Sequence, residues 1–98
     1  MRQRNLAYND LALLAMRRFQ HTDAITLLNH AIEAEVELEM RYSDHHPDHR
    51  FYINRGDCFM ALGRTELATA DFSIAHASAP LDSTVTTRIS MMPVSYTH

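Results

Sequence analysis

Apolar residues recur along this chain every three or four positions, which is the spacing of amphipathic helices. Few glycines and prolines interrupt them, which also favours helix. Thr22 and Thr65 are the expected N-caps of the second and fourth helices, and Gly63 is expected to end the third. The pattern predicts five helices, at residues 6–19, 21 or 22 to about 42, 52–62, 65–79, and 82 or 83 to 92.

One stretch of the second predicted helix also has the pattern of a strand. From Ile32 to Met40, apolar and acidic side chains alternate. In a helix, Ile32, Val36 and Met40 would form a stripe facing the core, and Glu37 could pair with Arg41. The acidic residues would then form a solvated helix face or, alternatively, a patch for a basic partner. These residues are Glu33, Glu35, Glu37 and Glu39.

The chain contains an internal repeat. Five residues in its first half match five in its second half at one constant offset of 44. The small residues of each set would let paired helices approach closely, and a larger residue would fill the gap between pairs. The matches are Tyr8 with Tyr52, Ala12 with Gly56, Ala24 with Ala68, Leu28 with Phe72, and Ala31 with Ala75.

The segment "YINRGDCFMALGRTELATADFSIAHASAP", residues 52–80, resembles a tetratricopeptide repeat over nearly its whole length. Its main departure is Arg55, where the family prefers leucine. The positions that carry the resemblance are Tyr52, Gly56, Phe59, Gly63, Ala68, Phe72, Ala75 and Pro80.

Two weaker copies flank this segment. In the first, Phe19 replaces the turn glycine of the family, and the last resembles only the opening of a repeat. The resemblance implies an all-α fold: a short right-handed α-solenoid of two stacked helix-turn-helix repeats plus the first helix of a third. Whether the chain is a segment of a longer array stays open. The implied divisions are a first repeat at 5–38, an insertion at 39–48, a second repeat at 49–82, the start of a third at 83–92, and a frayed tail at 93–98.

The insertion follows from the family period of 34 residues, because the two repeats here lie 44 residues apart. The extra residues would extend the second helix to about Tyr42 and add a polar loop. This loop holds His45, His46 and His49 beside two aspartates, which are ligand types for zinc or nickel. The sequence favours a solvated insertion. A metal-responsive binding module is the alternative.

The composition argues against several other functions. A net charge of −3 does not suggest the clustered basic face that binds nucleic acid, and no apolar run is long enough for a bilayer. Lysine is absent, so Schiff-base and P-loop lysine chemistry are excluded. Cys58 is the only cysteine, which predicts a buried structural thiol and a reducing compartment, the cytoplasm. Neither an enzyme nor a cofactor is expected.

The resemblance implies a concave surface lined by the first helix of each repeat. We therefore expect a non-catalytic protein–protein interaction module that binds a partner peptide or helix there. The alternative is that this strip packs against neighbouring repeats. Asn54 falls where chaperone-binding members hold a peptide carboxylate, but the accompanying lysines are absent. The expected groove residues are Leu6, Asn9, Leu13, Met16, Arg17, Arg50, Ile53, Asn54, Asp57 and Met60.

The ends of such a short solenoid should leave apolar residues uncovered, because each hairpin buries its face only against the next. Ala7 and Leu14 are expected at one end, and Ile89, Met91 and Met92 at the other. Marginal stability or self-association through these ends is therefore expected.

Overall fold

The computed structural model of the chain describes the backbone of residues 2–92 and the side chains of residues 4–92. Within these residues the chain is helical and contains no strand, which confirms the predicted all-α class. The predicted frayed tail lies outside the described residues. The helices are α1 (Arg2–Arg17), α2 (His21–Arg41), α3 (His49–Ala61), α4 (Thr65–Ser78) and α5 (Ser83–Ser90).

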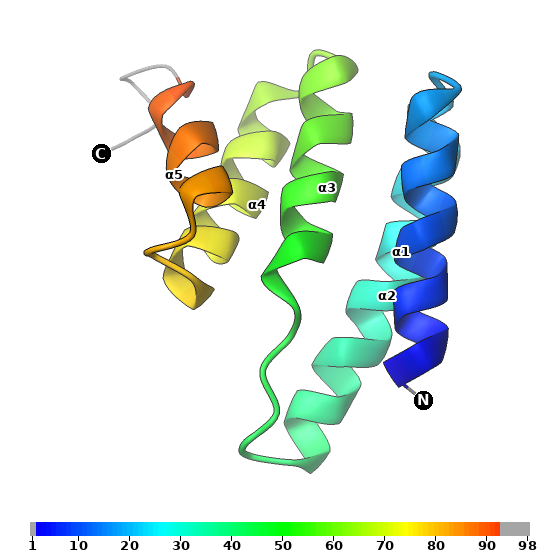
Figure 1. Ribbon diagram of the computed structural model, residues 1–98, viewed down its shortest axis with the longest axis vertical. Helices are drawn as coiled ribbons and strands as arrows, with labels where there is room; N and C mark the ends of the chain where they lie inside the picture. Colours follow the sequence, from blue (N-terminus) through cyan, green and yellow to red (C-terminus); the bar gives the residue numbers. More distant parts are fainter. Residues whose placement is uncertain (1, 93–98) are drawn as a thin grey trace.

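The helices form two layers, with α1, α3 and α5 in front and α2 and α4 behind them (Figure 1). We call the layer of α1, α3 and α5 the front layer. Each helix packs on the next along the chain, and across the short turns the chain reverses direction so that α1 pairs with α2 and α3 pairs with α4. α2 also contacts α3, so that the two hairpins stack. This arrangement confirms the predicted short solenoid of helical hairpins.

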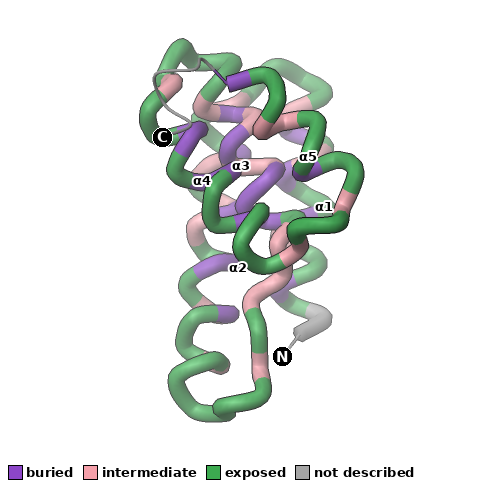
Figure 2. The backbone as a smooth tube through the Cα atoms, turned by 90° about the vertical axis from the view of Figure 1, so that its left-hand side faces the viewer, coloured by how far each residue is buried: buried purple, intermediate pink, exposed green. Residues whose placement is uncertain are grey.

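Small residues make the close contacts between the helices, as the repeat pattern predicted. A Cβ atom at Gly56 would lie 2.5 Å from Cε1 of Phe72, so nothing larger than glycine fits at that crossing without displacing the ring. The buried positions lie along the helix contacts (Figure 2). The fully buried small residues are Ala12, Ala24, Ala31, Ala68 and Ala75.

The core stripe predicted for α2, at Ile32, Val36 and Met40, is right at Ile32 and wrong at the other two positions. Leu28 and Ile32 are buried, but Val36 is 37% exposed and Met40 is 83% exposed. The last turns of α2 project beyond α1 and α3, where no layer covers that face (Figure 1). Glu35 is buried instead, at 1% exposure, because it faces α1 while Val36 does not. The prediction of a solvated face therefore fails at Glu35.

Two short turns of the chain share one geometry but not one residue type. The N–H of Gly63 donates to the carbonyl of Met60 at 3.0 Å, and the next N–H bonds back to Phe59 at 2.8 Å. Phe19 occupies the equivalent position after α1, and its N–H donates to the carbonyl of Met16 at 3.0 Å. Both residues adopt positive φ, +75° for Gly63 and +59° for Phe19. This Schellman-type ending suits glycine and strains phenylalanine.

The observed first residues of the helices show that three of the predictions are wrong. Neither Thr22 nor Thr65 is an N-cap, because both lie inside their helices: the N-caps of α2 and α4 are Gln20 and Arg64, and neither makes a side-chain cap. α3 begins at His49 rather than Tyr52. Its N-terminus is extended because Asp48 caps it, accepting a hydrogen bond from the backbone N–H of Arg50 at 3.0 Å.

The ends of the stack expose fewer apolar residues than expected. Ala7 and Leu14 are exposed at one end, as predicted. At the other end Met91 is 63% exposed, but Met92 is only 9% exposed. Met92 turns inward and packs with Ala68 and Phe72 beneath Ile89, so its predicted exposure is wrong.

Arg55, which stands where the family prefers leucine, joins three helices. Its guanidinium donates two hydrogen bonds to the carboxylate of Asp71, at 2.9 and 2.7 Å, and one to Oδ1 of Asn29 at 2.9 Å. It lies 5.6 Å from the ring centroid of Tyr52 and 6.0 Å from that of Phe59. The hydrogen bonds to Asp71 raise the pKa of Arg55. The pair therefore ties α3 to α4 and, through Asn29, to α2.

Replacing Asp71 by alanine should lower the free energy of unfolding by about 3 kcal/mol, because it leaves the Arg55 guanidinium without its buried partner. Urea denaturation followed by circular dichroism measures this. The double variant Arg55→Leu/Asp71→Leu should recover most of the loss, since it removes both charges. A double variant no more stable than Asp71→Ala would contradict this account. Glu37→Ala, which removes one partner of an exposed pair, is the control and should change stability by less than about 1 kcal/mol.

Phe19→Gly should raise the free energy of unfolding by about 1 kcal/mol, because glycine adopts a positive φ without steric strain. Gly63→Ala should have the opposite effect by a similar amount, although a Cβ there meets no neighbouring atom within 4 Å. Thermal and urea denaturation of the two variants and of the natural chain measure whether the free energy of unfolding rises in the first variant and falls in the second. A destabilised Phe19→Gly variant would show that the ring contributes to folding.

Candidate peptide-binding groove

The ten residues predicted to line a groove all lie on two front-layer helices, α1 and α3. They differ in accessibility. Leu6, Arg17, Arg50 and Met60 are exposed. Asn9 is 6% exposed and Ile53 is 4% exposed, so these two offer a partner little surface. The half-buried members are Leu13, Met16, Asn54 and Asp57.

Polar side chains tie neighbouring front-layer helices together. The amide nitrogen of Asn54 donates to Oδ1 of Asn9 at 2.8 Å, which joins α3 to α1. Arg88 donates two hydrogen bonds to the carboxylate of Asp57, at 2.6 and 3.0 Å, which joins α5 to α3. Arg88 was missed from the sequence. It lies 34 residues after Asn54, one family period, so the repeat spacing could have located it.

A hollow of about 340 Å³ opens between α3 and α5, beside this second pair. Its lining is largely apolar. Met60 and Met91 contribute exposed side chains, 39% and 63% exposed, while Phe72 lies beneath. The volume is at the lower end of the range for ligand sites. The lining residues are Asp57, Met60, Phe72, Arg88, Met91 and Met92.

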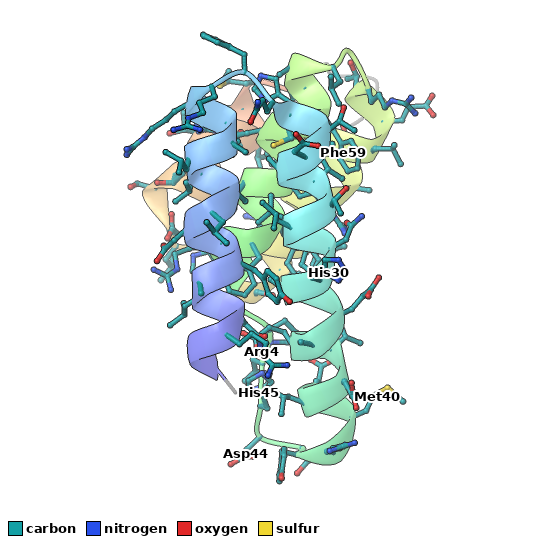
Figure 3. All side chains as sticks on the ribbon, turned by 90° about the vertical axis from the view of Figure 1, so that its right-hand side faces the viewer. Arg4, His30, Met40, Asp44, His45 and Phe59 are labelled. Atoms are coloured by element: carbon teal, nitrogen blue, oxygen red, sulfur yellow. The ribbon has the colours of Figure 1, made fainter. Side chains whose placement is uncertain are left out.

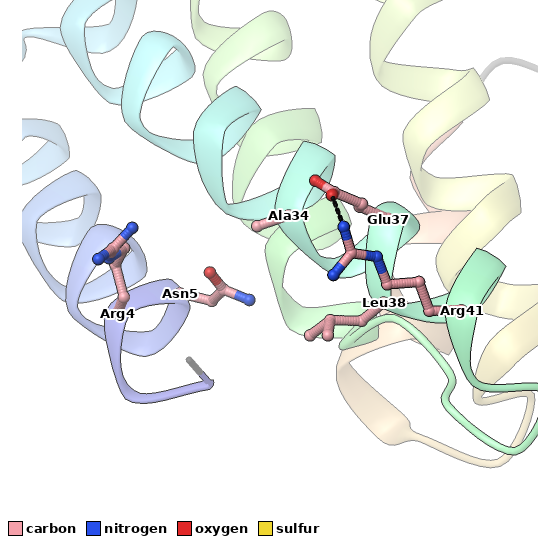
Figure 4. Close-up of a pocket in the computed structure, with 6 residues that line it drawn as sticks. All are labelled: Arg4, Asn5, Ala34, Glu37, Leu38 and Arg41. Carbon is pink, nitrogen blue, oxygen red and sulfur yellow. Dashed lines mark hydrogen bonds and ion pairs between the residues drawn. The ribbon is translucent and has the colours of Figure 1, made fainter.

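A second hollow, of about 170 Å³, lies between the start of α1 and the end of α2 (Figure 4). Arg4 and Asn5 line one wall, and Glu37 and Arg41 lie across from them. The predicted pair of Glu37 with Arg41 is confirmed, at 3.0 Å between Oε1 and Nη2. Both side chains are more than half exposed, so the pair contributes little to stability. None of the predicted groove residues lines this hollow.

The loop histidines contact different carboxylates rather than one another. Nε2 of His45 lies 2.9 Å from Oε2 of Glu35, whereas Nε2 of His49 lies 3.0 Å from Oδ2 of Asp82. His46 is exposed. Across residues 4–92, no three histidine, cysteine or acidic side chains are grouped as a metal would require. The arrangement therefore does not support the metal-binding alternative.

These contacts fix both ends of the inserted loop. At its start, the buried Glu35 carboxylate engages His45 and also accepts a hydrogen bond from the Asn5 amide at 3.3 Å. In Figure 3, His45 lies close to the first turns of α1, whereas Asp44 lies at the far tip of the loop. At its end, the His49 hydrogen bond lowers the pKa of the Asp82 carboxyl, which also caps α5. The histidines thus fasten this segment to α2 and to the N-cap of α5, and Glu35 connects it further to α1.

Comparison with known proteins agrees with this architecture. The chain is 35% identical, over 91 residues and 93% of its length, to the human and Macaca fascicularis proteins called tetratricopeptide repeat protein 16. The mouse protein of that name shows the same identity over the same length. The resemblance to tetratricopeptide repeats is thereby confirmed. The chain spans only 9% of the human and macaque proteins and 11% of the mouse protein.

The other comparisons gave no match. No family model matches the chain, and no solved structure matches it. Within residues 2–92, every helix is too short or too polar to span a lipid bilayer.

Cys58, the only cysteine of the chain, is inaccessible. Its exposure is 0%, and burial raises the pKa of its thiol to about 11. The carboxylate of Asp57, the residue before it, is engaged by Arg88. The predicted buried thiol is confirmed, and its chemistry is that of a packing residue rather than a nucleophile.

Alkylation of Cys58 by iodoacetamide at about pH 8 should be at least ~100-fold slower in the folded chain than in the urea-unfolded chain. The thiol is buried, and a pKa of about 11 leaves only about one thiol in a thousand ionised at that pH. Mass spectrometry of quenched time points measures the two rates. Similar rates in the two states would contradict the burial of this thiol.

Proposed function

We propose that this chain is a non-catalytic protein-interaction module that binds a partner peptide or helix along its front layer. The observation that carries the proposal is the apolar hollow between α3 and α5, in a chain that is similar to tetratricopeptide repeat protein 16. Two residues expected in the groove, Asp57 and Met60, line that hollow. We place the module in the cytoplasm, where its lone thiol suits a reducing environment.

The chemistry of the hollow suits a large apolar side chain of the partner. Methionines are flexible and polarisable, so Met60 and Met91 can adapt their shape to an inserted ring or branched chain. Asp57 and Arg88 hold their charges against each other at the edge of the hollow, with side chains 25% and 30% exposed. Asp57 can still accept a hydrogen bond from a peptide backbone that passes over the pair, and Arg88 can still donate one to it.

The rest of the proposed groove extends from this hollow across α3 to α1. Exposed and half-buried residues of these helices would contact the partner. Asn9 and Ile53 would support the surface from beneath, because both are buried. The proposed contact residues are Leu6, Leu13, Met16, Arg17, Arg50, Asn54, Asp57, Met60, Arg88 and Met91.

The double variant Met60→Ala/Met91→Ala should weaken binding of groove ligands at least ~10-fold, because it removes the walls that would surround an anchoring side chain. Peptides selected by phage display against the natural chain supply the ligands, and isothermal titration measures their Kd. Circular dichroism confirms that each variant keeps its helical content.

The matched control is Met40→Ala, which truncates a methionine that is 83% exposed on the projecting end of α2. It should leave every Kd unchanged. If the selected peptides bind the double variant as tightly as the natural chain, the hollow is not their site. If no peptide is selected at all, the groove proposal fails.

A further inference from the structure

The turn between α1 and α2 presents an aromatic side chain that the fold does not use. Phe19 is 85% exposed, and its backbone is held at a φ of +59°, which strains any residue with a Cβ. Its nearest aromatic neighbour is His21, in an edge contact with ring centroids 6.4 Å apart. A strained backbone and an exposed ring at one position point to a role outside the folded core.

Exposed arginines lie at the same end of the molecule as this ring. Arg17 and Arg18 precede it, and Arg64 lies on the α3–α4 turn at the same end of the molecule (Figure 1). All three are exposed, and none forms an ion pair with a carboxylate of residues 4–92. The described acidic residues near these turns, Asp23 and Glu66, lie in the first turns of α2 and α4, where they complement the helix dipoles. We call Arg17, Arg18, Phe19 and Arg64 the basic tip.

Of the five other arginines whose side chains are described, all but Arg4 have an acidic partner, unlike the arginines of the basic tip. The four with an acidic partner are Arg41, Arg50, Arg55 and Arg88. The chain as a whole carries a net charge of −3, so an uncompensated basic cluster is a local exception. Arginine and aromatic residues are enriched among the residues that dominate protein–protein binding energy.

We infer that the basic tip docks an acidic protein segment whose apolar side chains cover Phe19. Charge complementarity selects an acidic partner, and the exposed ring supplies the apolar anchor. A protein segment suits the tip better than a membrane surface, because interfacial binding relies on a broad apolar helix face rather than one turn residue. The basic tip shares no residue with the lining of the hollow between α3 and α5, so the inference does not rest on that hollow.

The test uses fluorescence anisotropy with the full chain and a labelled peptide of glutamate, leucine and phenylalanine. Phe19→Gly should weaken binding at least ~10-fold while the protein melts at the same or a higher temperature, so that unfolding cannot explain the loss. Arg18→Gln should weaken binding about 3-fold or more and reduce its dependence on salt. Arg17 is left unchanged because it also belongs to the proposed groove.

The control variant is Leu81→Ala, which removes a side chain that is 96% exposed away from these turns. It should bind the acidic peptide like the natural chain, as should Met60→Ala/Met91→Ala. Equal affinity of Phe19→Gly, or no binding of the acidic peptide below millimolar concentration, would overturn the inference.

Two other occupants of the basic tip have their own readouts. Binding of phosphatidylserine vesicles that depends on Phe19, without peptide binding, would assign the tip to a membrane. Concentration-dependent sedimentation that is lost in Phe19→Gly would assign it to a second copy of the chain. Either result would overturn the assignment to an acidic partner segment.

Discussion

The whole stack depends on how closely α3 and α4 approach each other at Gly56. The ring of Phe72 occupies the space that any side chain at residue 56 would need. This contact brings the second hairpin together, and α2 and α5 then pack against it from either side. Fully buried alanines play the same role in the first hairpin. Backbone proximity, rather than a large apolar core, therefore determines where each helix lies.

Polar contacts then fasten helices that small residues alone would leave free to slide. Arg55 reaches both Asp71 and Asn29, and Glu35 reaches both Asn5 and His45. Each of these bonds joins different elements rather than neighbouring turns of one helix. Buried hydrogen bonds have strict geometric requirements, so they favour one relative position of the helices over others. A leucine in place of Arg55 would fill space but would not link α3 to α2 in this way.

Most of the fold, but only part of the polar detail, could be predicted from the sequence. The matching small and large residues at an offset of 44 suffice to pair the helices, because close packing leaves few alternatives. The burial of Glu35 could not be predicted, since four glutamates alternate along α2 and look alike in sequence. Which glutamate is buried depends on its partners Asn5 and His45, which lie 30 and 10 residues away from Glu35 in the sequence. The histidine loop suggested a metal for the same reason: its partners, Glu35 and Asp82, lie outside it.

The same internal bonds limit what the exposed surfaces can recognise. In the front layer, Asn54 is bonded to Asn9, and Asp57 is bonded to Arg88. A partner at the hollow between α3 and α5 meets charges that are already neutralised, so its selectivity there would have to come from shape and apolar contact. Such binding responds little to salt. The arginines of the basic tip have no such partner, so attraction to an acidic segment there would weaken as salt rises. The two surfaces thus differ in the physical force that each can use, and salt dependence separates them even before either partner is identified.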